Sequence, residues 1–255
     1  TGAIEATGHK VCPVLTKDGK LTPDLIRPVL DMHENEHWVD PRLVYVSNPT
    51  EVGTVYTKEE LEDLYAFCKR HDLYFYIDGA RLAAALAAKE ETHLTFPDLP
   101  KLCDAFYIGG TKVGAMFGEA LVLVNENFKE RFRFNMKQKG AILAKGWFLG
   151  VQFEELFKNN LYIEAGAHSI AMMKPIKEAF EKAGIPLLCE APTNQIFPIF
   201  PNALADEINK KYLTTFQCKP DKDHTCLRFC TSWATNENAV KDFVEDFEEM
   251  CNRLL

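Results

Sequence analysis

Reactive side chains directly follow two apolar runs of this chain. Asp78-Gly79-Ala80-Arg81 comes after residues 73–77, and Gly110-Thr111-Lys112-Val113-Gly114 comes after residues 104–108. A lysine amine can form a Schiff base with a carbonyl carbon, and an aspartate can hold a protonated ring nitrogen. An arginine can bind a carboxylate through two parallel hydrogen bonds. These residue types together indicate covalent chemistry on a carboxylate-bearing substrate.

The combination fits the requirements of pyridoxal phosphate, which needs an anchoring lysine and a carboxylate at its pyridine nitrogen. We therefore interpret Lys112 as the anchor and Asp78 as the partner of the nitrogen. Each residue also has an ordinary interpretation, since a lysine after a strand is usually just exposed and Asp78 could cap the following alanine-rich helix. The glycines around Lys112 and the nearby Asp78 motif favour the cofactor interpretation.

The segments around these residues alternate between predicted strands and helices. Apolar runs predict strands at 43–47, 73–77 and 104–108, and a return strand at 119–124. A capping box, Thr57-Lys58-Glu59-Glu60, predicts a helix between the first two strands. Such βαβ units predict a mainly parallel sheet, which binds ligands beyond the carboxyl ends of its strands. Asp78 and Lys112 both lie at such ends.

The pattern changes near residue 155, after a predicted helical stretch over 140–158. Beyond it, the sequence predicts short strands and helices that no longer alternate regularly. They are a helix at 164–182, strands at 185–189 and 195–200, a helix at 203–212, strands at 215–218 and 226–231, and a final amphipathic helix. We therefore predict an α/β fold with a large, mainly parallel domain at 1–155 and a small C-terminal α+β domain at 156–255.

Composition excludes several classes of partner. The net charge of −8 argues against nucleic acid or an anionic membrane as the main partner, because both attract basic surfaces. No apolar run approaches the roughly 18 residues that a membrane helix needs. The eight cysteines are scattered without a CxxC pair. Free thiols in a reducing cytosol are the expected state, so we predict a cytoplasmic protein.

One motif suggests different chemistry. His33-Glu34-Asn35-Glu36-His37 matches the zinc-peptidase pattern H-E-x-x-H. On a continuous helix the two imidazoles would lie one turn apart and could bind zinc, with Glu34 as the base. Against this alternative, a helix that opens at Thr22-Pro23 is predicted to end near Glu34, and no third ligand has a recognisable spacing. We therefore predict no metal, and zinc hydrolysis is a distant alternative.

Beyond the individual residues, the chain resembles the low-specificity L-threonine aldolases of the beta-eliminating lyase family. These are pyridoxal-phosphate enzymes with the aminotransferase-like fold type I. The resemblance runs almost from end to end. It rests on five motifs: 47–53 (SNPTEVG), 78–81 (DGAR), the lysine loop 110–114, 193–197 (TNQIF) and 228–233 (RFCTSW). Many aldolases have Ser-Lys-Gly-Leu-Gly at the lysine, so Thr111-Lys112-Val113-Gly114-Ala115 indicates a divergent branch.

The resemblance implies roles for six residues. Lys112 would be the Schiff-base lysine and Asp78 the partner of the pyridine nitrogen. Arg81 and Arg228 would hold the substrate carboxylate, and Arg81 would also order the surroundings of the cofactor. His37 would lie by the substrate hydroxyl, and Lys137 would reach the cofactor phosphate of a neighbouring subunit. The resemblance also implies that the family's phosphate-binding loop and ring-stacking histidine lie upstream of Thr1.

The implied activity is that of a lyase of amino acid metabolism. It would cleave the Cα–Cβ bond of L-threonine or related β-hydroxy-α-amino acids to glycine and an aldehyde. β-Elimination or transamination on the same scaffold is the alternative, because those enzymes would share Lys112 and Asp78. An inactive scaffold is a further alternative. Fold type I enzymes build their sites at dimer interfaces, and the mixture of aromatic and cationic residues at 132–137 is typical of interface anchors. We therefore expect a homodimer or homotetramer.

Overall fold

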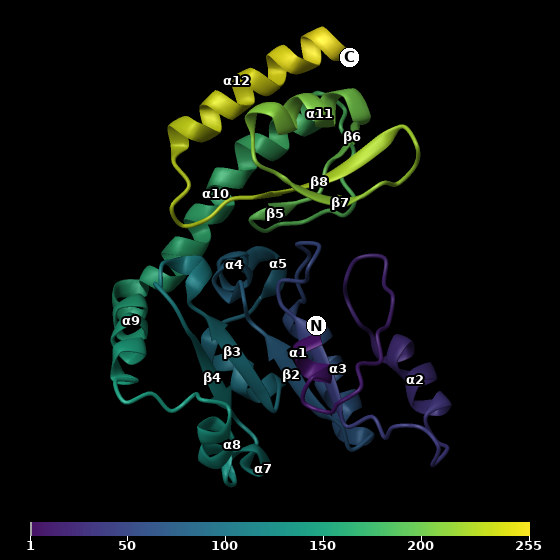
Figure 1. Cartoon of the computed structure of the whole chain (residues 1–255), viewed down its shortest axis with the longest axis vertical. Helices are drawn as coiled ribbons and strands as arrows, with labels where there is room; N and C mark the ends of the chain where they lie inside the picture. The colour runs from purple at the N-terminus through teal and green to yellow at the C-terminus, as the bar shows by residue number, and fades with distance from the viewer. Residues whose placement is uncertain (1) are drawn as a thin grey trace.

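A four-stranded sheet organises the first half of the chain. In the computed structural model, which describes residues 2–255, its strands lie in the order β1 (Leu43–Ser47), β2 (Tyr74–Asp78), β3 (Ala105–Gly109) and β4 (Glu119–Leu123) (Figure 1). The first three strands are parallel, and β4 returns antiparallel to β3. The predicted α/β class, with a mainly parallel sheet and a return strand, is confirmed.

Helices cover one face of this sheet. The buried side chains of Val44, Val46, Phe75, Ile77 and Phe106 point to that face and form one core with the helices. The covering helices are α3 (Lys58–Arg70), α4 (Leu82–Ala87), α6 (Leu99–Leu102), α9 (Trp147–Phe157) and the start of α10 (Leu161–Lys182). The capping box predicted at the start of α3 is present. Because side chains alternate along a strand, the other face carries a different set of residues.

The remaining helices of the first half are short. They are α1 (Gly2–Glu5), α2 (Pro23–Met32), α5 (Lys89–Thr92), α7 (Glu126–Lys129), α8 (Phe132–Gln138) and the 3₁₀ turns η1 (Phe96–Asp98), η2 (Thr111–Val113) and η3 (Lys158–Asn160). The helix predicted over 140–158 begins only at Trp147, so the prediction is wrong for residues 140–146. Gly140 takes a positive φ of 75°, which a continuing right-handed helix does not accommodate.

The second half forms its own sheet and core. Its strands are β5 (Gln195–Ile196), β6 (Ile199–Pro201), β7 (Thr215–Cys218) and β8 (His224–Cys230), and β8 pairs antiparallel with the other three. The strand predicted at 185–189 is reduced to a single bridge between Leu187 and Pro198. Helices α10, α11 (Asn202–Lys211) and α12 (Glu237–Leu254) cover one face of the sheet, as Figure 1 shows.

Helix α10 belongs to both halves. Tyr162 near its start is buried in the first core, whereas Phe180 near its end is buried in the second, with T-shaped contacts to Phe200, Phe229 and Phe247. The two cores are therefore linked by one continuous helix. Across residues 2–255, no helix combines the length and the apolar character needed to cross a membrane.

A buried carboxylate fastens β2 and β3 to their surroundings. Asp104 is 1% exposed and accepts hydrogen bonds from Lys69 Nζ (2.7 Å), the Phe75 amide (2.8 Å) and Asn125 Nδ2 (2.7 Å). Burial alone would raise the pKa of Asp104, but the bonds from Asn125, Lys69 and Phe75 outweigh burial and lower it. The ionised form of the Asp104 carboxyl therefore stabilises the folded state.

Asp104→Ala should lower the free energy of unfolding by about 3 kcal/mol, because it leaves the Phe75 amide and Lys69 without their acceptor. Urea unfolding at neutral pH would measure this. Asp63→Ala, at an exposed position on α3, is the control and should change stability by less than about 0.5 kcal/mol. The difference between wild type and Asp104→Ala should shrink as pH falls below about 4, because the carboxylate of the unfolded chain then binds a proton that the native carboxylate, with its lowered pKa, does not yet bind. Equal stability of the two variants at neutral pH would contradict the assignment.

Candidate active site

The carboxyl ends of the parallel strands bring together the residues around Lys112. Asp78 ends β2, Arg81 precedes α4, and Lys112 lies in η2 directly after β3. Partial burial and then the positive charge of Arg81 lower the pKa of the Lys112 amine. The carboxylates of Glu51, Asp78 and Glu119 act in the opposite direction. A larger fraction of Lys112 is therefore neutral and nucleophilic than of an ordinary lysine.

Glu119 holds the loop that carries Lys112. Its Oε2 accepts the Gly110 amide at 2.5 Å, and its Oε1 accepts the Thr111 hydroxyl at 3.0 Å. The loop closes at Gly114, whose φ of 105° is strained for any residue with a Cβ. Sequence patterns could not predict this role for Glu119, because the contact depends on β4 returning beside β3.

Both oxygens of Asp78 are held as well. Oδ1 accepts the Ala80 amide at 2.9 Å, and Oδ2 accepts the hydroxyl of Tyr45 on β1. Between Asp78 and Ala80, the backbone of Gly79 approaches β3 so closely that a Cβ there would lie 2.0 Å from the Tyr107 carbonyl oxygen. The turn after β2 thus requires glycine, and it fixes the direction of the Asp78 carboxylate.

Segments from the C-terminal half reach the same loops. The Trp233 ring lies 3.5 Å from the position that a Cβ on Gly114 would take. The Thr193 hydroxyl donates to the Gly53 carbonyl at 2.7 Å. The motifs 47–53, 193–197 and 228–233 are therefore neighbours of the lysine loop or of one another in the folded chain, although they are far apart in the sequence.

Buried amides and a guanidinium leave polar atoms unpaired near these contacts. Asn48 Nδ2, Asn194 Oδ1, Arg228 Nε and both amide atoms of the fully buried Gln195 have no hydrogen-bond partner among residues 2–255. Arg228 otherwise donates to the Thr215 hydroxyl at 3.3 Å. Leu227, Phe229 and Ile196 point into the second core, so Arg228 and Gln195 lie on the opposite sheet face.

These groups fit pyridoxal phosphate and a carboxylate substrate. Native proteins seldom leave buried polar atoms unpaired, so the unpaired atoms indicate a ligand or water. Asn48 lies beside Asp78, since its backbone N–H donates to the Asp78 carbonyl at 2.9 Å, and its side-chain Nδ2 has no partner among the described residues. The Lys112 amine and the Asp78 carboxylate supply the two groups that the pyridoxal ring requires. Apart from their place in the motifs 47–53 and 193–197, nothing in the sequence pointed to Asn48 or Gln195.

The structure does not bring His37 to this edge of the sheet. His37 is exposed and lies in the loop that leads into the amino end of β1, whereas Asp78 and Lys112 follow carboxyl ends. The expected place of His37 beside the substrate hydroxyl therefore finds no support in this fold. The local resemblance aligned His37 with a family histidine, but it could not show that the residue lies near the amino end of β1.

Lys137 also lies outside the site of its own chain. It is exposed on α8, which follows β4 at the end of the sheet away from α4 (Figure 1). Lys137 therefore lies away from the lysine loop of its own chain.

The zinc alternative fails on geometry. Helix α2 ends at Met32, so His33 and His37 do not lie on one helix. The ring of His33 instead contacts the Val29 carbonyl at 2.7 Å and packs edge-on against Trp38. The predicted end of this helix near Glu34 was two residues late. Among residues 2–255, no group of three or more His, Cys, Asp or Glu residues is arranged to hold a metal ion.

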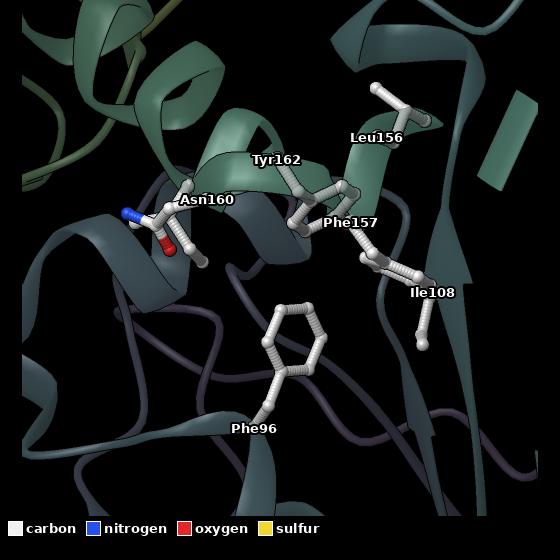
Figure 2. Close-up of a pocket in the computed structure, with 7 residues that line it drawn as sticks. Phe96, Ile108, Leu156, Phe157, Asn160 and Tyr162 are labelled. Carbon is white, nitrogen blue, oxygen red and sulfur yellow. The ribbon is translucent and has the colours of Figure 1, made fainter. Parts of the chain in front are cut away.

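A separate apolar pocket of about 330 Å³ lies on the helix-covered side of the sheet. Figure 2 shows its mainly aromatic and aliphatic lining, which includes Phe96, Ile108, Leu156, Phe157, Asn160 and Tyr162. The Tyr162 hydroxyl is already used, since it donates to the Gly109 carbonyl at 2.9 Å. Tyr162 in this lining thus holds the end of β3, which precedes the lysine loop. The lining offers no further acid–base group for the chemistry described above.

Comparison with known proteins agrees with this fold. A model of the beta-eliminating lyase family matches residues 1–200. Low-specificity L-threonine aldolases from Pseudomonas sp. and Pseudomonas aeruginosa are 29% and 27% identical over 94% of this chain and 69% of each relative. The solved structure of Leishmania major threonine aldolase is 48% identical, covers 98% of this chain with 73% of its own length, and superposes with a TM-score of 0.95.

The fold, the site and these matches define a lyase that uses pyridoxal phosphate and has the aminotransferase-like fold type I. Within that class, the chain belongs to the beta-eliminating lyase family, together with the threonine aldolases that it resembles.

Replacing Arg81 tests the electrostatics of the lysine. Arg81→Gln removes a positive charge near the Lys112 amine, so the pKa of that amine should rise toward the ordinary lysine value of about 10.4. Competitive acetylation across pH in the absence of cofactor, read by peptide mass spectrometry, would measure it. Arg70→Gln, at the exposed end of α3, is the matched control and should leave the pKa of Lys112 unchanged. Equal titration of Lys112 in wild type and Arg81→Gln would show that Arg81 does not act on the amine.

Proposed function

We propose that this protein cleaves the Cα–Cβ bond of L-threonine, or of related β-hydroxy-α-amino acids, to glycine and an aldehyde. The observation that carries the proposal is the Lys112 amine, with its lowered pKa, placed among Asp78, Arg81 and Glu119 at the carboxyl edge of the sheet. The 48% identity to a threonine aldolase supports the choice of substrate.

The proposed roles follow from the positions of the residues. When bound, pyridoxal phosphate supplies a ring that accepts the electron pair released at Cα. Lys112 holds the cofactor and moves protons at Cα, and Asp78 keeps a proton on the pyridine nitrogen. Arg228, whose Nε is free, binds the substrate carboxylate together with Arg81. Glu119 keeps the lysine loop in place through Gly110 and Thr111.

The reaction conserves atoms. Cleavage of threonine gives glycine and acetaldehyde, with one proton leaving the β-hydroxyl and one arriving at Cα. Elimination from the same substrate would instead release ammonia and leave a four-carbon oxoacid. Product analysis therefore separates the proposed activity from the family's other chemistry.

Incubation with L-threonine and pyridoxal phosphate should yield glycine and acetaldehyde in equal amounts, measured by chromatography and by a coupled alcohol dehydrogenase. Lys112→Ala should lower turnover by at least about a thousandfold, and Asp78→Asn should lower it sharply while the protein stays folded. Lys174→Ala, at an exposed position on α10, is the control and should retain full activity. Ammonia without glycine would assign elimination instead, and full turnover by Asp78→Asn with bound cofactor would remove Asp78 from its role.

We further propose that the protein is a homodimer or homotetramer in which Lys137 reaches the cofactor phosphate of a neighbouring subunit. The exposed side chains of Phe134 and Lys137 on α8, at the far end of the sheet from Lys112, support a role between subunits. A cytosolic location is proposed as well, supported by eight cysteines that are all free.

Light scattering should give a mass at least twice the 29.0 kDa of one chain, because the site is expected to need two subunits. Co-expression of inactive Lys112→Ala and Lys137→Ala chains should restore activity in mixed dimers, since one of the two sites then has both lysines. A mass of one chain at all concentrations would refute the assembly. Verified mixed dimers without activity would refute the role of Lys137 alone.

A further inference from the structure

Three tyrosines lie side by side on the sheet face that the helices leave open. Tyr45 on β1 pairs in register with Tyr76 on β2, and Tyr107 follows on β3. The rings of Tyr45 and Tyr76 stack at 5.3 Å between centroids with an angle of 16°, and those of Tyr76 and Tyr107 lie 6.4 Å apart. We refer to these three residues as the tyrosine row. Asp78 lies on the same face, two residues beyond Tyr76.

The two outer tyrosines of the row both face the Asp78 carboxylate. The Tyr45 hydroxyl donates to Oδ2. Burial, followed by the hydrogen bond and then the charge of Asp78, raises the pKa of Tyr45, and the same causes in the same order raise that of Tyr107. Burial and then the charge of Asp78 raise the pKa of Tyr76 to about 12, without a bond between the two side chains. All three phenols therefore stay protonated near neutral pH, and the outer two remain donors.

We propose that Tyr45 is a positioning residue, which holds the Asp78 carboxylate at the angle from which it accepts the ring nitrogen of the cofactor. The inference rests on the proposed function, in which Asp78 pairs with that nitrogen. Tyr76 packs against both outer rings, and Asp78 contributes to the raised pKa of Tyr107 as well.

The hydrogen-bonding capacity of Asp78 leaves room for this role. An ionised carboxylate offers about four lone-pair directions. The Ala80 amide occupies one on Oδ1 and the Tyr45 hydroxyl one on Oδ2, so the carboxylate is fixed at both oxygens and still has acceptor sites for a ring N–H. Without the Tyr45 hydroxyl, the carboxylate keeps only the Ala80 hydrogen bond on Oδ1, and more of its ordering then falls to cofactor binding.

The first test is cofactor affinity. Tyr45→Phe removes one hydroxyl and keeps the stacked ring, so pyridoxal phosphate should bind about tenfold more weakly, as expected for the loss of a hydrogen bond to a charged group. Tyr76→Phe, the same change on the adjacent ring, should bind within about twofold of wild type. Equilibrium titration followed by cofactor absorbance would measure all three proteins, and circular dichroism would verify that each is folded.

The second test does not require the Tyr45 variant to fold. Asp78→Asn removes a charge that raises the pKa of Tyr45, so the alkaline ionisation of the tyrosines should begin at lower pH than in wild type. Near-ultraviolet absorbance would count the ionised phenols without cofactor. Unchanged ionisation would overturn the inference, because it would show that Asp78 and Tyr45 do not interact.

The outcomes separate this inference from the proposed function. Weakened binding in both Asp78→Asn and Tyr45→Phe, with normal binding in Tyr76→Phe, supports the positioning role. Weakened binding in Asp78→Asn alone overturns the role of Tyr45 and leaves the proposed function intact. Wild-type binding in Asp78→Asn overturns the assignment of Asp78 itself, and the positioning role with it.

Discussion

Parallel pairing of β1, β2 and β3 is the constraint on which the rest of the site depends. Parallel strands end at the same edge, so the residues that follow them meet even though long segments of chain separate them. The register of Ser47 with Asp78 places Asn48 beside the Asp78 carbonyl. The next strand delivers Lys112 to the same edge. A slip of one residue in β2 would turn Asp78 to the helix-covered face and bury it without its partners.

The second half of the chain completes this edge. Helix α10 is anchored beneath the lysine loop, because the Tyr162 hydroxyl donates to the Gly109 carbonyl. The same helix continues into the second core, which orients the sheet that carries Arg228. Trp233 and Thr193 then contact the loops of the first half. The residues proposed to bind the substrate and the cofactor therefore come from both halves, and α10 connects the two halves.

The sequence was sufficient for the features that local patterns determine. Apolar runs and turn residues located all four strands of the first sheet within one residue, and they placed Asp78 and Lys112 at strand ends. It was insufficient for features that depend on contacts across strands. Glu119 and Tyr45 carry no motif, and their bonds to the lysine loop and to Asp78 arise from strand register. For His37, a local resemblance does not show at which end of a strand its loop lies, so the sequence could not predict how far it is from Asp78 and Lys112.

Reductive trapping of the cofactor tests the central claim most directly. The protein would be equilibrated with pyridoxal phosphate, reduced with borohydride, digested, and mapped by mass spectrometry to find the modified lysine. The account predicts that the label lies on the peptide containing Lys112, and that Lys112→Ala takes up no specific label. A stoichiometric label on any other lysine would contradict the assignment of Lys112 and, with it, the site built around Asp78.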